Sequence, residues 1–263
     1  MASASTVRHP KGRTHASPEA GPTAGGFLSA VLDSSVGAKL TVGITGLALV
    51  GFVIAHLIGN LKVFQGPDAI NHYAYFLKHD LGILIWIARA GLLGVFLLHL
   101  VLALRLQFRS RAARPVPYSY PGSVQASIAS RLMMQTGIVV GIFIVFHLAH
   151  FTFGWVKDAQ YVDASGKTVV SNYLDLVDSK GRHDVYRMMV AGFQTSWISI
   201  LYIVAQLVLF LHLRHGIPST LQTLGVKSAR WMRPIDLAGL AIALAILVGN
   251  LSIVIAVWAG YVS

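Results

Sequence analysis

The sequence predicts an all-α protein that crosses a membrane with five helices, and two observations lead to this prediction. Hydrophobic residues make up 55% of the 263 residues and charged residues only 12%, whereas a soluble domain has about twice that charged share. Five apolar runs are each long enough to span about 30 Å of hydrocarbon at about 1.5 Å per residue. In lipid, such runs satisfy their backbone hydrogen bonds as helices. The runs cover approximately residues 40–61, 81–106, 132–156, 190–213 and 237–262.

The first 35 residues differ in composition from the rest of the chain. They are rich in Ala, Ser, Gly, Pro and Thr, and they carry Arg8, Lys11 and Arg13. No apolar core follows these charges closely, so the pattern is not that of a signal peptide. We predict a mobile cytoplasmic arm over residues 1–35 and a single five-helix domain over residues 36–263.

The distribution of Lys and Arg predicts the orientation of the helices. The N-terminal arm, the loop between the second and third runs and the loop between the fourth and fifth runs together hold thirteen basic residues and three acidic ones. The other side has seven of each. The positive-inside rule therefore places the N-terminus in the cytoplasm and the C-terminus outside. The long outer segment 157–187 contains the turn sequence DASGK, which predicts a hairpin between Tyr161 and Val170 that caps the outer face.

Four of the five runs carry a histidine near their end. With the predicted orientation, His56 and His147 lie toward the outer side, and His99 and His212 lie toward the cytoplasmic side. Two axial ligands must approach a haem iron from opposite faces, so they must come from two different helices. The spacing therefore predicts two bis-histidine haem sites at two depths in the bundle. The absence of cysteine excludes covalent c-type haem and thiolate-bound clusters.

A threonine–glycine pair precedes both outer histidines by the same spacing. Gly46 lies ten residues before His56, and Gly137 lies ten residues before His147. Ten residues are close to whole helical turns, so each glycine is expected on nearly the same helix face as its histidine. There it would leave room for a flat macrocycle or for close approach of a neighbouring helix.

Other uses of intramembrane histidine have to be weighed against haem. A single histidine can simply hydrogen-bond across helices, but four histidines at paired depths favour a shared role. Zinc needs three or four close ligands, and the spans offer no carboxylate to complete such a set. A proton relay usually needs Asp or Glu within the membrane, and none lies mid-span.

Further polar side chains lie near the predicted haem levels. Arg89 is the one charge well inside a span, and it lies ten residues before His99, about 15 Å toward the outer haem. Its expected partner is a haem propionate or a polar quinone site, and the alternative is that it snorkels to the surface. The other candidates for propionate or neighbouring contacts are His150, Arg131, Arg214 and His215.

Several segments together resemble a known family, the five-helix dihaem cytochrome b subunit of succinate dehydrogenase and fumarate reductase. The resemblance covers most of residues 36–260. The segments are HLIGNLKVF at 56–64, NHYAYFLK at 71–78, WIARAGLLGVFLLH at 86–99, RAARPVPY at 111–118, SRLMMQTG at 130–137, HLAHFTFG at 147–154 and HLRHGIPSTLQTLG at 212–225.

The resemblance implies a function in the respiratory chain of a prokaryote, in its cytoplasmic membrane. The family's axial ligands match His56 and His147 for a distal haem b, and His99 and His212 for a proximal haem b. It also implies a flavoprotein subunit and an iron–sulfur subunit on the cytoplasmic face, with menaquinone as the usual electron acceptor. This chain departs from fumarate reductases that use membrane glutamates, because Phe210 stands two residues before the fourth ligand.

The quinone site has two candidate locations. An outer site would use Arg89 within the span together with polar groups near the outer ends of the first two helices, because a quinone needs hydrogen-bond donors and a route for protons. The outer candidates besides Arg89 are His72, Tyr73, His79 and Asp80. An inner site would lie near Arg131.

Two alternative functions remain open for the chain as a whole. One is a dihaem membrane anchor of a nitrate reductase or hydrogenase. The other is a haem-free transporter or scaffold.

Overall fold

The computed structural model describes residues 26, 29, 32–113, 127–162, 165–226 and 228–263. Most of the predicted arm 1–35 lies outside the described residues. Five helices are long and apolar enough to cross a membrane, which confirms the predicted all-α bundle. They are α2 (Ser35–Asn60), α4 (Ile83–Ala112), α6 (Met133–His147, continued by the π-helical turn η3, Leu148–Thr152), α8 (Ser196–Thr223) and α9 (Ala229–Trp258).

Shorter elements connect these helices. Between α2 and α4 the chain forms η1 (Leu61–Gln65), α3 (Pro67–Tyr75) and η2 (Phe76–Asp80). The short helix α5 (Ile128–Arg131) precedes α6. The segment between α6 and α8 contains β1 (Ala159–Val162), β2 (Thr168–Ser171), η4 (Tyr173–Asp175) and α7 (Val185–Phe193).

The predicted outer hairpin is present. Strands β1 and β2 pair antiparallel, with Tyr161 opposite Val169. Residues 163 and 164 of its turn lie outside the described residues.

The fourth apolar run differs from its prediction as one span over 190–213. The chain breaks after Phe193 and starts a new helix at Ser196, so that α7 and α8 are separate helices. The Ser199 hydroxyl donates to the Phe193 carbonyl at 2.5 Å, which satisfies a carbonyl that the end of α7 leaves without a helical partner. The sequence did not reveal this break because the residues on both sides of it are apolar and buried, among them Phe193 and Ile198.

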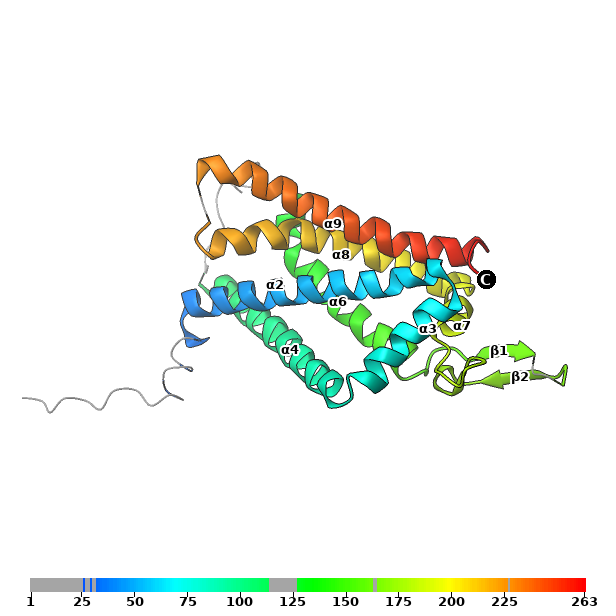
Figure 1. Cartoon of the computed structure of the whole chain (residues 1–263). Coiled ribbons are helices and arrows are strands. Elements are labelled where there is room, and N and C mark those ends of the chain that lie inside the picture. The colour runs from blue at the N-terminus through cyan, green and yellow to red at the C-terminus, as the bar shows by residue number, and fades with distance from the viewer. Residues whose placement is uncertain (1–25, 27–28, 30–31, 114–126, 163–164, 227) are drawn as a thin grey trace, which may run out of the picture.

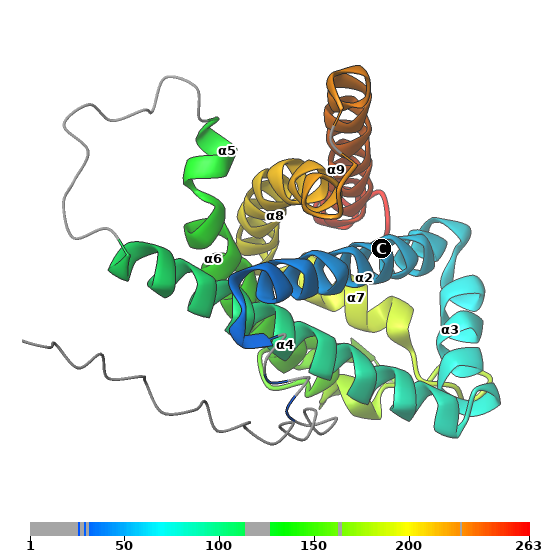
Figure 2. The same ribbon diagram turned by 90° about the vertical axis from the view of Figure 1, so that its left-hand side faces the viewer.

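Helix α8 lies at the centre of the bundle. It packs along α9, α6 and α2, whereas α4 packs mainly on α2 (Figures 1 and 2). The core between α2, α8 and α9 contains Leu57, Tyr202 and Ile246. Gly249 of α9 permits close packing there, because a Cβ at this position would lie 2.8 Å from a Leu57 methyl group.

Large apolar side chains also cover the outside of the spans. Trp86, Ile87, Ile142, Val145 and Val248 are all more than half exposed. A continuous apolar exterior of this kind is unfavourable in water and favourable in a bilayer.

The two ends of the bundle are built differently (Figure 1). The start of α2, the end of α4 and the connection from α8 to α9 lie at one end, which we call the basic end. Here Asp33 accepts hydrogen bonds from Arg105 through its carboxylate at 2.5 Å and from Arg109 through its carbonyl at 2.7 Å. Helices α3 and α7, the hairpin and the C-terminus lie at the opposite end, which we call the loop end. The loops therefore divide between the two ends as the order of the five predicted spans requires.

Candidate functional site

Two of the predicted ligands meet toward the loop end. His56 lies near the end of α2, and His147 is the last residue of α6. Their ring centroids are 5.8 Å apart, and the ring planes are perpendicular. Phe52, one turn before His56, stacks on that imidazole at 5.4 Å. We call His56 and His147 the loop-end pair.

The other two predicted ligands lie on α4 and α8, where His99 packs against Gly46 of α2 and His212 packs against Gly137 of α6. We call His99 and His212 the basic-end pair. His99 Nδ1 lies 3.1 Å from the Val42 carbonyl oxygen and 3.2 Å from Thr45 Oγ1. Because a carbonyl oxygen can only accept, His99 Nδ1 carries the proton. This hydrogen bond fixes the tautomer, and Nε2 remains free to bind a metal.

His212 is held by the matching residues of α6. Its Nδ1 lies 3.3 Å from Thr136 Oγ1, and the Met133 carbonyl of α6 lies near the same ring. Thr136 directs its own proton back to the Leu132 carbonyl of α6 at 2.9 Å, which leaves a hydroxyl lone pair for His212. Helices α2 and α6 thus offer the same arrangement, a carbonyl and a threonine three residues later, to the two basic-end histidines.

The glycines of the repeated threonine–glycine pairs, which the sequence predicted to leave room for a macrocycle or a neighbouring helix, lie against histidines of other helices. A Cβ at Gly46 would lie 3.2 Å from His99 Cε1, and one at Gly137 would lie 3.1 Å from His212 Cε1. Ten residues of helix extend about 15 Å, which brings each glycine to the level of the basic-end pair. The expected close approach is present, but the neighbour is an imidazole of another helix.

A buried tyrosine of α8 connects the loop-end pair to a third histidine. The Tyr202 hydroxyl lies 3.1 Å from His147 Nδ1 and 3.0 Å from His150 Nδ1. His150 is fully buried and its ring packs on Phe151 at 4.0 Å. Among the described residues, His150 Nε2 and the Tyr173 hydroxyl are the buried side-chain polar atoms without a hydrogen-bond partner. The sequence predicted a role for His150 but not for Tyr202, whose only signal is a phenol within an apolar run.

Arg89 lies on the outside of α4. Its side chain is exposed, and its guanidinium group lies 4.9 Å from the centre of the Trp86 ring. Among the described residues it has no carboxylate partner. An arginine over a tryptophan near a helix end is typical of the membrane interface.

The other four residues of the candidate quinone region make their contacts separately. Tyr73 of α3 packs against Gly59 of α2, and His79 stacks on Tyr75 with ring centroids 4.2 Å apart. The side chains of His72 and Asp80 are exposed. The structure therefore places these groups at the loop end without joining them in one hydrogen-bonded site.

The remaining candidates are on α5 and α8. Arg131 ends α5 and is exposed. Arg214 is exposed and His215 is half-buried, and both follow His212 on the same helix.

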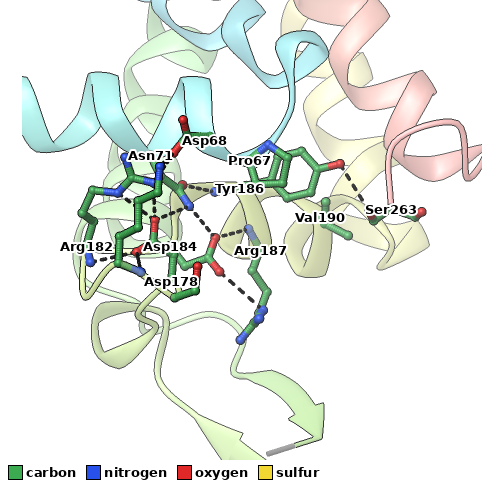
Figure 3. A pocket seen from close by; sticks show the side chains of 12 residues that line it. Pro67, Asp68, Asn71, Asp178, Arg182, Asp184, Tyr186, Arg187, Val190 and Ser263 are labelled. Atoms are coloured by element: carbon green, nitrogen blue, oxygen red, sulfur yellow. Dashed lines mark hydrogen bonds and ion pairs between the residues drawn. The ribbon is translucent and has the colours of Figure 1, made fainter.

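A polar cluster that sequence reasoning missed joins α3 to the segment before α7 (Figure 3). The Arg182 guanidinium group contacts Asp178 at 2.6 Å and Asp68 at 2.7 Å. Asn71 is fully buried, and it donates to Asp184 at 3.1 Å and accepts from the Tyr186 backbone N–H at 3.0 Å. These groups line a cavity of about 610 Å³ at the loop end.

The cluster is held by strongly ionised carboxylates. Burial alone would raise the pKa of Asp178, but the side chain and backbone N–H of Arg182 and the backbone N–H of Lys180 outweigh it and hold this pKa at about 2. Hydrogen bonds from Lys180 and Arg182 also lower the pKa of Asp68. These ion pairs therefore hold α3 to the segment before α7. We call Asp68, Asp178, Lys180 and Arg182 the charged lock.

The two histidine pairs are the residues that could hold haem groups. Each histidine pair offers two imidazoles from different helices, and His99, His147 and His212 are each hydrogen-bonded at Nδ1. Within the described ranges, no group of three or more His, Cys, Asp or Glu side chains could hold a metal ion. Two opposed imidazoles are what an iron with four macrocycle nitrogens still needs.

No family model, curated protein or solved structure matches the chain. The bundle and the side chains described above are the basis on which a function can be inferred.

Proposed function

We propose that this chain is the membrane anchor and electron-transfer subunit of a succinate:quinone oxidoreductase and that it holds two b-type haems. The observation that supports this best is the pairing of four histidines from α2, α4, α6 and α8 at two levels of one bundle. Haem would supply one-electron transfer at each level. His56 and His147 would hold the group at the loop end, and His99 and His212 the group at the basic end.

The protein's own contribution is to orient these ligands. The Val42 carbonyl accepts from His99 Nδ1, and Thr136 Oγ1 lies beside His212 Nδ1, so that Nε2 of each ring would be the atom that binds iron. Glycine at positions 46 and 137 lets these rings lie against α2 and α6. An imidazole fixed in this way needs little reorganisation to act as a ligand.

The basic end is the proposed cytoplasmic face, in the inner membrane of a prokaryote, following the excess of Lys and Arg in its loops. There the chain would bind an iron–sulfur subunit and a flavoprotein subunit that contains the dicarboxylate site. Arg105 and Arg109 lie on this face, already in contact with Asp33. Electrons from succinate would enter here and leave to a quinone, with menaquinone as the expected type.

The proposed quinone region is the loop end near Arg89. Support comes from its guanidinium group, which lies over the Trp86 ring near the start of α4, where a donor could meet a quinone carbonyl. The competing location near Arg131 lies on the opposite half of the bundle and would bring the quinone next to the iron–sulfur partner.

The decisive experiment is purification of the chain from its native membrane with any associated subunits, followed by a reduced-minus-oxidised spectrum and a haem assay. The proposal expects two b-type haems per chain, a flavoprotein and an iron–sulfur subunit, and succinate-dependent reduction of both haems. Co-purification of molybdenum or nickel subunits would instead indicate a nitrate reductase or hydrogenase anchor. Folded protein without haem absorption would indicate a transporter or scaffold and would refute the proposal.

A further inference from the structure

The loop-end pair is supported differently from the basic-end pair. At the basic end, His99 Nδ1 uses the Val42 carbonyl of a neighbouring helix, and the Thr45 and Thr136 hydroxyls lie beside His99 Nδ1 and His212 Nδ1. At the loop end, His56 stacks on Phe52, and His147 uses the side-chain hydroxyl of Tyr202. That hydroxyl is shared with His150, whose Nδ1 lies at almost the same distance.

The Tyr202 hydroxyl has only one proton, and this limits how His147, Tyr202 and His150 can be protonated together. A phenol has a single proton, so it can donate to one of the two Nδ1 atoms and must accept from the other. If His147 binds a metal through Nε2, its Nδ1 is protonated and donates to the Tyr202 oxygen. The Tyr202 proton then points to His150 Nδ1, and His150 carries its own proton on Nε2.

We propose that Tyr202 is a positioning residue that sets the electron donation of His147 at the loop-end site, through a directed chain from His147 to Tyr202 to His150. This inference rests on the proposed function, because it concerns the ligand of a bound haem. All three groups are buried or half-buried, and hydrogen bonds in such surroundings polarise one another. The Tyr202 oxygen is therefore a better acceptor when its own proton is bound by His150.

The consequence is a difference between the two sites. An acceptor on Nδ1–H raises the basicity of an axial imidazole, which stabilises the oxidised iron and lowers its reduction potential. At the basic end this role belongs to the Val42 carbonyl and to the Thr45 and Thr136 hydroxyls, and a substitution at Tyr202 or His150 alters none of them. At the loop end the role belongs to two side chains, so its potential can be altered without affecting the other site.

The test is a redox titration of the purified two-haem complex, with the ferric low-spin signals recorded by electron paramagnetic resonance. Tyr202→Phe removes the hydroxyl and keeps the ring. It should shift the loop-end potential upward and change that site's ferric signal, with the basic-end potential unchanged. His150→Leu leaves the Tyr202 oxygen in place but removes the acceptor of its proton, and it should give a smaller shift in the same direction.

Tyr173→Phe is the matched control. Tyr173 is equally buried and its ring lies 5.6 Å from that of His150, but its hydroxyl has no hydrogen-bond partner among the described residues. This variant should leave both potentials and both signals unchanged. Loss of the loop-end haem alone in Tyr202→Phe would also support the inference, since only a hydroxyl is removed.

Two outcomes would overturn the inference. The first is a Tyr202→Phe protein with both potentials unchanged. The second is an equal shift from the Tyr173→Phe control. If Tyr202→Phe does not assemble, His150→Leu decides alone, and an unchanged loop-end potential in that variant would count against the chain. A wild-type protein without haem would refute the proposed function itself, and it is recognised before any variant is measured.

Discussion

The Val42 carbonyl oxygen on α2 accepts a hydrogen bond from His99 Nδ1 on α4, over 3.1 Å. On α6, Thr136 Oγ1 lies 3.3 Å from His212 Nδ1 of α8. Helices α2 and α6 therefore support the basic-end histidines, whereas His147 of the loop-end pair relies on Tyr202 of α8. This difference makes the two sites separable by substitution.

Replacing His147 with Ala should remove the loop-end haem and leave most of the basic-end signal. The reason is that His147 contacts only His56 of the other three proposed ligands. Haem content and the reduced-minus-oxidised spectrum of the inserted protein provide the measurement. The exposed His72, replaced by Ala, is the control and should keep both haems. Equal loss of the two signals in a folded His147→Ala protein would contradict the pairing.

Gly46→Ala should disturb the basic-end site although Gly46 is on the same helix as a loop-end ligand. The added methyl group would lie 3.2 Å from His99 Cε1, and overpacking of this kind typically costs about 1–3 kcal/mol. The spectrum of the basic-end haem should change, and that of the loop-end haem should not. Gly51→Ala on the same helix is the control, because a Cβ there meets nothing within 4 Å. A change confined to the loop-end haem would favour the original expectation from the sequence.

The charged lock at the loop end should open at acidic pH. The pKa of Asp178 is lowered to about 2 in the folded protein, so its stabilising contribution is present above its ordinary value near 3.8 and is lost as the pH falls toward 2. The hydrogen-exchange protection factors of residues 176–187, corrected for the intrinsic exchange rate at each pH, should therefore fall between about pH 4 and 2. The Arg182→Gln protein should already exchange faster at neutral pH. A loss of protection in this segment when the pH of the wild-type protein is raised from 5 to 8 would contradict the predicted direction of the pH dependence.

Arg89→Leu tests the proposed quinone region. Succinate-driven quinone reduction should fall by at least about tenfold, equivalent to about 1.4 kcal/mol, while succinate oxidation with an artificial dye survives. Arg114→Leu, a basic residue far along the chain from this region, provides a charge-matched control. Wild-type quinone turnover in an Arg89→Leu complex with both haems would place the site elsewhere, and an inhibitor bound near Arg131 would identify the alternative.

The sequence by itself determined the number of spanning helices and the depths of the four histidines. Apolar run length specifies a span because lipid leaves the backbone no other partner, and the rise per residue converts a position such as His56 into a depth. The division of the loops between two ends followed from chain order, since each span reverses the direction of the chain.

Only the tertiary structure decided which residues meet. Gly46 lies against His99, and Tyr202 lies between His147 and His150, because α2, α4, α6 and α8 have particular rotations about their axes. A sequence pattern locates a side chain on its own helix but does not say which neighbour that face contacts. The same holds for Asn71 and Asp184, which are 113 residues apart and become partners only when α3 packs on α7. The local hydrophobic pattern therefore predicts the helices, whereas packing between segments distant in the sequence determines which side chains form the histidine sites.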